Sequence, residues 1–327
     1  MDNLTHSMTA AVAAKFVRKK NLAAGAEPYS QRAIFWLLVA SVNFPDLDVV
    51  MLIFGDPILT IKTHRWVTHS LIGIPFFAVI PAAVFYRFSS IKDFRFLWLT
   101  AQLGILLHIC CDLVTPYGTQ LFAPFSVERF TLGSMFIIDL YFSFGLMTLL
   151  LLGRLDARRR NIWRKAALAY FVGFIALTFT LKQYTDARVH GVMRTKKIAY
   201  TKISTLPQPL SIFRWVALVQ TETGVRRAFF SLFDGELEFE DLRHTSDPVA
   251  TAALKHQNAQ WYMSFAHHPL IHSYKQGADK VIEIYDLQFS PPPWLVKAMA
   301  SRRPRPPFTL QLIFSNDGQL KHSAFNE

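Results

Sequence analysis

The sequence predicts a polytopic α-helical membrane domain of about six helical segments, followed by a small α+β soluble domain. Of the 327 residues, 51% are hydrophobic and only 18% are charged, an apolar excess too large for an ordinary soluble protein. Residues 33–182 contain nearly all the long apolar runs, whereas residues 183–327 have a mixed, water-soluble composition. We therefore divide the chain into a helical membrane domain over 1–182 and an α+β domain over 183–327.

Four apolar runs are close to the length of about 20 residues that crosses a bilayer core. They are residues 71–88, 94–114, 132–153 and 166–182. Two weaker segments precede them, and we expect 3–20 and 29–44 to form a helical hairpin that enters the membrane and returns. One continuous span over 33–54 is less favourable, because Asp46 and Asp48 near the bilayer centre would together cost roughly 5–7 kcal/mol.

The basic residues predict an orientation for these segments. Six passes would place the basic stretches 18–32, 87–95 and 154–165 on one side, which the positive-inside rule makes cytoplasmic. The net charge of +12 is then explained by loops at the membrane surface, so we do not expect nucleic-acid binding. The opposite ends of the segments and the α+β domain would lie outside the cytoplasm.

After residue 183 the pattern changes from long apolar runs to alternation. The stretches "SIFRWVALVQ" and "GVRRAFFSLFDG" alternate apolar with polar residues around the turn "TETG", which is typical of a β-hairpin. "VIEIYDLQF" and "FTLQLIFSNDG" predict further strands, and residues 249–266 predict a helix. The three histidines of "AHHPLIH" have no carboxylate nearby, so we expect them at the surface and not in a metal site.

The strongest candidate for chemistry is "LLHICCDLVTPYG", within the second of the four long apolar runs. His108 and Asp112 are four residues apart, so a helix places them one turn apart on the same face. A histidine and a carboxylate at this spacing can share a divalent metal ion, and ionisable residues within an apolar segment are functional candidates. The alternative is a pair that only satisfies its own hydrogen bonds inside the bundle.

Further histidines and aspartates gather at the same ends of the predicted segments. Asp46 and Asp48 in "NFPDLD" can converge on a metal if the backbone turns, although acidic residues at helix ends are also common as plain caps. His64 and His69 in "THRWVTHS" are five residues apart, so they can share a site only if the first lies in the preceding loop. His6 in "DNLTHS" is a weak candidate by itself. Together such residues suit zinc, with manganese as the alternative, and their number implies two or more ions.

Four stretches of the N-terminal part also occur together in one known family: "DNLTHSMTAA", "NFPDLD", "HRWVTHS" and "HICCDLVTPYGTQLFAPFS". In this order they resemble the YdjM-type family of membrane-bound proteins of bacteria and archaea, which are classed as metal-dependent hydrolases. That family is distantly similar to zinc-dependent phospholipase C and to single-strand nucleases of the same helical fold. The resemblance implies a bacterial inner-membrane protein with a His/Asp metal cluster that includes His108 and Asp112. The family usually has Gly after "HR", where this chain has Trp66, which can narrow access to the site.

These residues predict a metal-dependent hydrolase that acts on phosphoesters of lipids or lipid-linked substrates at the outer face of the cytoplasmic membrane. The candidate metal ligands are His6, Asp46, Asp48, His64, His69, His108 and Asp112. Asp46, Asp48 or Asp139 could instead orient the attacking water. Arg65 could contact an anionic substrate, through two hydrogen bonds if the group is a phosphate.

Two other functions remain open at this point. A metal-ion or proton transporter would also have intramembrane His and Asp, although its ionisable residues should be staggered toward both faces of the membrane. A non-catalytic membrane anchor would hold a structural metal and use its soluble domain to bind a partner. A structural site closes with four protein ligands, whereas a catalytic site leaves one position open.

Overall fold

The computed structural model describes residues 1–17, 29–54, 63–245, 247–298 and 306–326, and these divide into two compact units. The first, here called the helical unit, holds the described residues up to 182 together with 209–212. The second, here called the sheet unit, holds 183–208 and the described residues from 213 onward.

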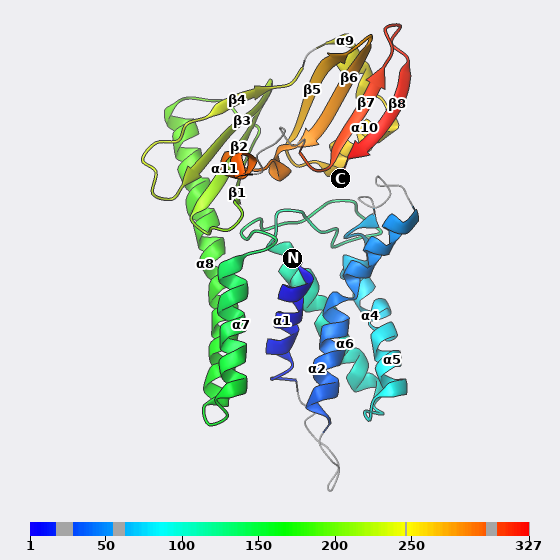
Figure 1. Cartoon of the computed structure of the whole chain (residues 1–327), viewed down its shortest axis with the longest axis vertical. Helices are drawn as coiled ribbons and strands as arrows, with labels where there is room; N and C mark the ends of the chain where they lie inside the picture. The colour runs from blue at the N-terminus through cyan, green and yellow to red at the C-terminus, as the bar shows by residue number, and fades with distance from the viewer. Residues whose placement is uncertain (18–28, 55–62, 246, 299–305, 327) are drawn as a thin grey trace. The chain divides into compact units, whose positions relative to one another are not determined.

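The helical unit consists of α-helices joined by loops and short 3₁₀ helices (Figure 1). Its α-helices are α1 (Asn3–Ala13), α2 (Gln31–Asn43), α4 (Gly73–Phe77), α5 (Val79–Phe88), α6 (Phe94–Leu113), α7 (Leu140–Leu155) and the first part of α8 (Arg160–Thr195). The 3₁₀ helices are η1 (Pro45–Phe54) and η2 (Val67–His69). Asp2, Asp93 and Asp139 begin α1, α6 and α7, because each carboxylate accepts a first-turn backbone N–H that would otherwise lack a partner.

The predicted set of six membrane-crossing segments is wrong. Within the described part of the chain, only α6, with 20 residues, and α8, with 36, are long and apolar enough to cross a bilayer. The apolar run at 71–88 is helical only over Gly73–Phe88, as α4 and α5, and the run at 132–153 becomes helical only at Leu140. At 1.5 Å per residue, the 11 residues of α1 and the 13 of α2 reach about 17–20 Å, short of a core of roughly 30 Å. The orientation predicted from the basic loops assumed six membrane crossings, so it no longer follows from that argument.

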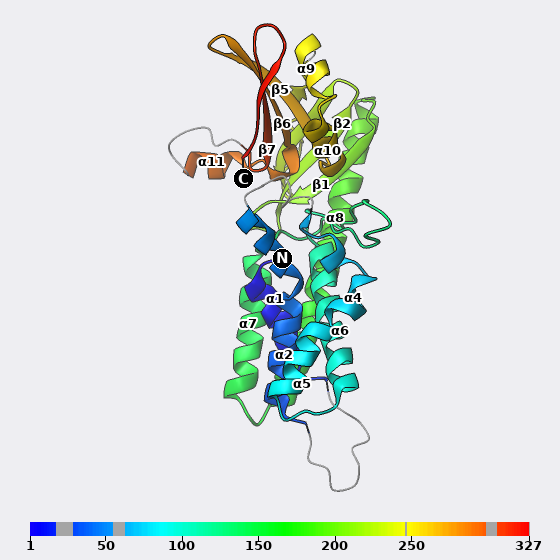
Figure 2. The same cartoon turned by 90° about the vertical axis from the view of Figure 1, so that its right-hand side faces the viewer.

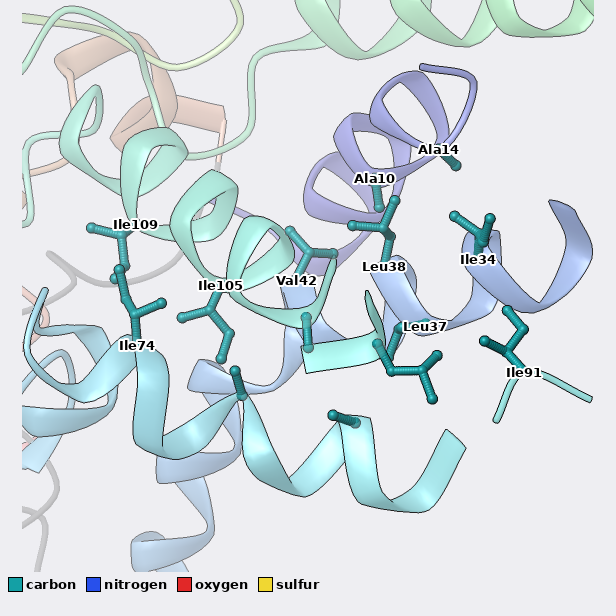
Figure 3. Close-up of a cluster of buried hydrophobic side chains, with 14 residues drawn as sticks. Ala10, Ala14, Ile34, Leu37, Leu38, Val42, Ile74, Ile91, Ile105 and Ile109 are labelled. Atoms are coloured by element: carbon teal, nitrogen blue, oxygen red, sulfur yellow. The ribbon is translucent and has the colours of Figure 1, made fainter. Parts of the chain in front are cut away.

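Helices α1, α2, α5 and α6 enclose the main apolar core of the helical unit. Figure 3 labels its buried side chains Ala10, Ala14, Ile34, Leu37, Leu38, Val42, Ile74, Ile91, Ile105 and Ile109. Helices α2 and α6 approach closely at Gly104, where a Cβ atom would lie 2.6 Å from Ser41 Cβ and 3.2 Å from Val42 N. Because Gly104 precedes His108 by one helical turn, this contact holds the second half of α6 against the end of α2.

The sheet unit contains two four-stranded antiparallel sheets, each in sequential strand order (Figure 1; Figure 2 shows the view turned by 90°). The first consists of β1 (Lys202–Pro207), β2 (Arg214–Thr221), β3 (Gly224–Ser231) and β4 (Glu240–Arg243). The second consists of β5 (Pro269–Gln276), β6 (Asp279–Asp286), β7 (Thr309–Phe314) and β8 (Leu320–Asn326). The helices α9 (Pro248–Ala253), α10 (Gln257–Phe265) and α11 (Pro293–Ala298) and the 3₁₀ helix η3 (Leu287–Phe289) lie between strands in sequence. The hairpin predicted around "TETG" is confirmed, because β2 and β3 pair antiparallel up to Thr221 and Gly224.

The last turns of α8 belong to the sheet unit. Thr185 Oγ1 lies 2.7 Å from Thr205 Oγ1 on β1, and Asp186 Oδ1 accepts a hydrogen bond from Thr205 N. In the second sheet, His272 is exposed as predicted. His268 is only 1% exposed and its backbone N–H donates to Asp286 Oδ1, so the prediction that it lies at the surface is wrong.

Candidate metal centre

Four side chains of the helical unit meet at the C-terminal end of α6. They are Asp46 from η1, His69 from η2, and His108 and Asp112 from α6, and we call them the four-residue cluster. One ligand atom from each residue lies within 4.8 Å of the other three. His69, His108 and Asp112 are fully buried, whereas Asp46 keeps 18% of its side chain exposed. The cluster could therefore hold a metal ion, and its accessible edge is at Asp46.

The distances within the cluster fit a single divalent ion. The Nε2 atoms of His69 and His108 lie 3.0 Å apart, and Asp46 Oδ1 lies 3.5 Å from each of them. Asp112 Oδ2 is 3.5 and 3.4 Å from the same two nitrogens and has no hydrogen-bond partner among the described residues. Ligand atoms 2.0–2.1 Å from a tetrahedral zinc ion lie roughly 3.3 Å from one another. A cation at the centre would satisfy lone pairs that otherwise face each other.

The hydrogen bonds behind the two histidines direct their Nε2 atoms at the cluster. His108 Nδ1 lies 2.6 Å from the carbonyl oxygen of Val42, in the last turn of α2. Since a carbonyl oxygen can only accept, Nδ1 carries the proton and donates this hydrogen bond. His69 Nδ1 lies 3.0 Å from Thr68 Oγ1 and 3.4 Å from Asp48 Oδ2. Metal-binding histidines are held in this way, with one nitrogen hydrogen-bonded to the protein and the other left as the ligand.

Asp48 lies outside the four-residue cluster and contacts the histidine His69 on the side away from it. Its Oδ1 is 2.8 Å from His64 Nδ1, and its Oδ2 accepts hydrogen bonds from Arg65 N at 3.1 Å and Thr68 Oγ1 at 2.9 Å. Burial by itself would raise the pKa of Asp48, but hydrogen bonds with His64 and His69 hold this pKa well below its ordinary value. Asp48 is therefore a carboxylate that orients the two neighbouring rings.

The electrostatic environment of the cluster favours positive charge. Burial lowers the pKa of His69, but the carboxylates of Asp46 and Asp48 outweigh this effect and raise it overall. Burial raises the pKa of Asp46, and its hydrogen bond with His69 and the nearby His108 reverse this effect and lower it. The site thus stabilises ionised carboxylates and an added cation alike.

His6 lies on the other side of Asp112. Its ring stacks on that of His108 with centroids 4.0 Å apart, and its Nε2 is 3.4 Å from Asp112 Oδ1. The side chain is fully buried, and neither ring nitrogen has a hydrogen-bond partner among the described residues. The α-amino group of Met1 lies 2.5 Å from the same Asp112 oxygen. His6 is therefore a further candidate ligand on the Oδ1 side of this carboxylate.

Arg65 is turned into the site and not out toward a substrate. Its Nε lies 2.9 Å from Asp112 Oδ2, without the alignment of a hydrogen bond, and its Nη1 donates to Thr115 Oγ1. The backbone of Arg65 has a φ of 61°, a left-handed conformation that is uncommon for a residue with a side chain. This guanidinium compensates the charge of Asp112, so the predicted contact with substrate has to compete with that ion pair.

Residues 1–187 match the family described as YdjM inner membrane protein. The chain belongs to the YdjM inner membrane protein family. "Uncharacterized protein YfhP" of Bacillus subtilis (strain 168) is 34% identical over 115 residues, and this match spans 35% of each chain. No solved structure matches the chain. The YdjM match includes the helical unit up to residue 182 and every residue of the four-residue cluster, so the candidate metal site lies in the part of the chain that matches the family.

Of the residues that the sequence of this YdjM protein singled out, Asp139 is the one that the structure leaves apart. Its Oδ1 accepts a hydrogen bond from Phe142 N at the start of α7, and within the described ranges no contact joins it to the cluster. Sequence reasoning missed Tyr117, whose ring lies 4.8 Å from the Arg65 guanidinium and 5.5 Å from that of Arg129. Tyr117 follows the HxxxD pair within "TPYG", and an aromatic residue between two cationic ones is the signal that could have identified it.

Proposed function

We propose that this YdjM protein is a metal-dependent hydrolase of phosphoesters that works at the membrane surface. The main support is the four-residue cluster, whose two imidazole nitrogens and two carboxylate oxygens lie at the spacing of metal ligands. The partial exposure of Asp46 supports a site that water or a substrate can reach, as a catalytic metal site requires.

The proposed metal is zinc, with manganese as the alternative. Asp46, His69, His108 and Asp112 would hold one ion, and His6 would extend the donor set toward a second ion on the Oδ1 side of Asp112. A set of imidazole nitrogens and carboxylate oxygens suits either metal. When bound, zinc supplies Lewis-acid polarisation of a phosphoryl oxygen and activation of water.

The protein's own residues would orient the site and move protons. Asp48 fixes the rings of His64 and His69 through its two oxygens. The His64 side chain is 22% exposed, so it is the member of this set that can exchange a proton with water or with a leaving group. Arg65 holds Asp112 in place and neutralises part of its charge.

The proposed substrates are lipid or lipid-linked phosphoesters. Support comes from large apolar side chains that remain exposed on η1 and around η2, the two elements that carry Asp46 and His69. They are Leu47, Val49, Val50, Trp66, Leu71 and Ile72. Such a concentration of exposed apolar residues next to a polar site suits the boundary between acyl chains and head groups.

The hydrolase proposal predicts that Asp48→Asn weakens zinc binding by about 10–100-fold, the usual effect of removing an outer partner of a metal-binding histidine. Phosphodiester hydrolysis by the zinc-loaded full chain in mixed micelles should fall with it, and a chelator should abolish the wild-type activity. Asp139→Asn is the matched control, because asparagine also caps a helix and Asp139 does not contact the cluster. A zinc-loaded wild-type protein without hydrolytic activity would favour a structural metal in a membrane anchor.

We further propose that the metal centre and the sheet unit lie outside the cytoplasm. The loop between α7 and α8 carries Arg158 and Arg159 beside the helix ends, and positive residues of this kind favour the cytoplasmic side. A topology reporter fused after Ala157 should therefore be cytoplasmic, and one fused after Phe325 should be extracytoplasmic because α8 separates them. If both reporters give the same side, the proposed location is wrong.

A further inference from the structure

An open cavity of about 540 Å³ lies in the helical unit between α1, α2, α7 and the first turns of α8, and no residue of the four-residue cluster lines it. Helix α1 packs between the other two helices (Figure 1). One part of the wall is apolar and follows the lengths of α1 and α7. Its principal side chains are Leu4, Met8, Phe35, Met147, Leu150 and Leu151.

The other part of the wall is strongly basic. It is formed by Lys15, Arg154, Arg160 and Arg164, and none of the lining residues that the structure describes is acidic. In the described ranges none of these four side chains forms an ion pair with a carboxylate. The Nε atom of Arg164 is buried without a hydrogen-bond partner. Cations gathered in this way, without a carboxylate paired to them among the described residues, are suited to bind an anion.

The position of Lys15 supports the same conclusion. Burial, together with the charges of Arg164 and Arg160, lowers the pKa of Lys15. A nearby anion would relieve this repulsion. Lys15 follows the end of α1 by two residues, so α1, a helix of about 17 Å, leads from the apolar part of the wall at Leu4 to the basic part.

We infer that this cavity binds an anionic phospholipid, with the phosphate held by Lys15, Arg160 and Arg164 and an acyl chain lying along the apolar wall. A small inorganic anion would use the basic end only and would leave the apolar wall without a ligand. A zwitterionic lipid would use the apolar wall, but its own cation would face the four basic residues. Basic pockets between membrane helices recognise anionic head groups for this reason. The inference goes beyond the proposed hydrolase, because it concerns a lipid that is held and not cleaved.

The test is lipid binding by the purified full chain in detergent, measured by native mass spectrometry with phosphatidylglycerol and phosphatidylcholine of equal chain length. Wild type should bind phosphatidylglycerol at least about fivefold more tightly than phosphatidylcholine. The double variant Lys15→Ala/Arg164→Ala should reduce this preference to less than about twofold. Inorganic phosphate at the same concentration as the lipid should not displace phosphatidylglycerol.

The matched control is Arg158→Ala/Lys165→Ala, which removes the same charge from exposed positions outside the cavity wall. It should keep the wild-type preference. Filling the apolar wall with Leu150→Trp should weaken phosphatidylglycerol binding without changing zinc content, which separates this site from the metal centre. The inference is overturned if wild type shows no preference, if the cavity variant keeps it, or if the control loses as much as the cavity variant.

Discussion

Replacing Asp112 with asparagine is expected to reduce the bound metal to less than about a tenth of the wild-type content. Oδ2 of this residue lies within 3.5 Å of both imidazole Nε2 atoms, so it is a central ligand atom of the cluster. Asparagine has nearly the same size but carries no charge, and it leaves the Arg65 guanidinium buried beside the site without its carboxylate. The loss of metal affinity should exceed the 10–100-fold effect of removing a residue that only hydrogen-bonds to a metal-binding histidine.

The measurement is elemental analysis of purified full-length protein after equilibration with zinc and removal of excess metal. Thermal unfolding of the same sample shows whether the variant is still folded. His108→Ala should behave in the same way, and His272→Ala should not change the metal content, because this histidine is exposed on β5. Unchanged metal in both cluster variants would show that the four residues do not form a metal site.

A leucine at position 104 is expected to prevent the helical unit from forming its native core. The Cβ atom alone would lie 2.6 Å from Ser41 Cβ, which is closer than such atoms approach in proteins, and 3.3 Å from Leu38 O. Helices α2 and α6 would therefore have to separate along their most extensive contact. Even Gly104→Ala should cost about 1–3 kcal/mol, the usual effect of overpacking a well-packed core.

The same substitution tests the link between helix packing and the metal centre. His108 follows Gly104 by one turn and donates to the Val42 carbonyl oxygen, so separation of the helices removes the partner that orients His108. Gly104→Ala should lower both the thermal midpoint in detergent and the zinc content. Gly173→Ala is the control, since Gly173 on α8 has no atom within 4 Å of its would-be Cβ atom. Equal stability of the two variants would contradict the role of the α2–α6 contact.

Local spacing in the sequence carried much of the information about the site. The interval of four residues between His108 and Asp112 predicts that they share a helix face, and the structure places both in the cluster. The relation between Asp46 and Asp48 depends on the backbone of η1, which their spacing alone does not predict. In the structure the carboxylate of Asp46 lies in the cluster near His69 Nε2, whereas that of Asp48 lies near His69 Nδ1, on the other edge of the ring. The inward turn of Arg65 could not be predicted, since it follows from a tertiary contact with Asp112.

The number of membrane-crossing helices could not be read from apolar composition. Hydropathy reports what a segment is made of, whereas crossing a bilayer also requires an unbroken helix of sufficient length. The limited helical extent of Gly73–Phe88 and the late start of α7 shorten two of the predicted spans. Asp139, which the sequence suggested as a catalytic candidate, is the N-cap of α7. An aspartate within an apolar run is a signal for the start of a helix.

The four-residue cluster also affects the order in which the protein comes apart. His69 and His108 are 39 positions apart in the chain, and Asp46 lies upstream of both, so holding their side chains at one point closes two loops of the backbone. Loop closure costs conformational entropy, which is restored as soon as the point of closure is released. The short 3₁₀ helices η1 and η2 have little regular hydrogen bonding to offset this cost. In metal-free protein, backbone amides of Val67–His69 should therefore exchange with solvent before those of α6, at a free energy below that of global unfolding.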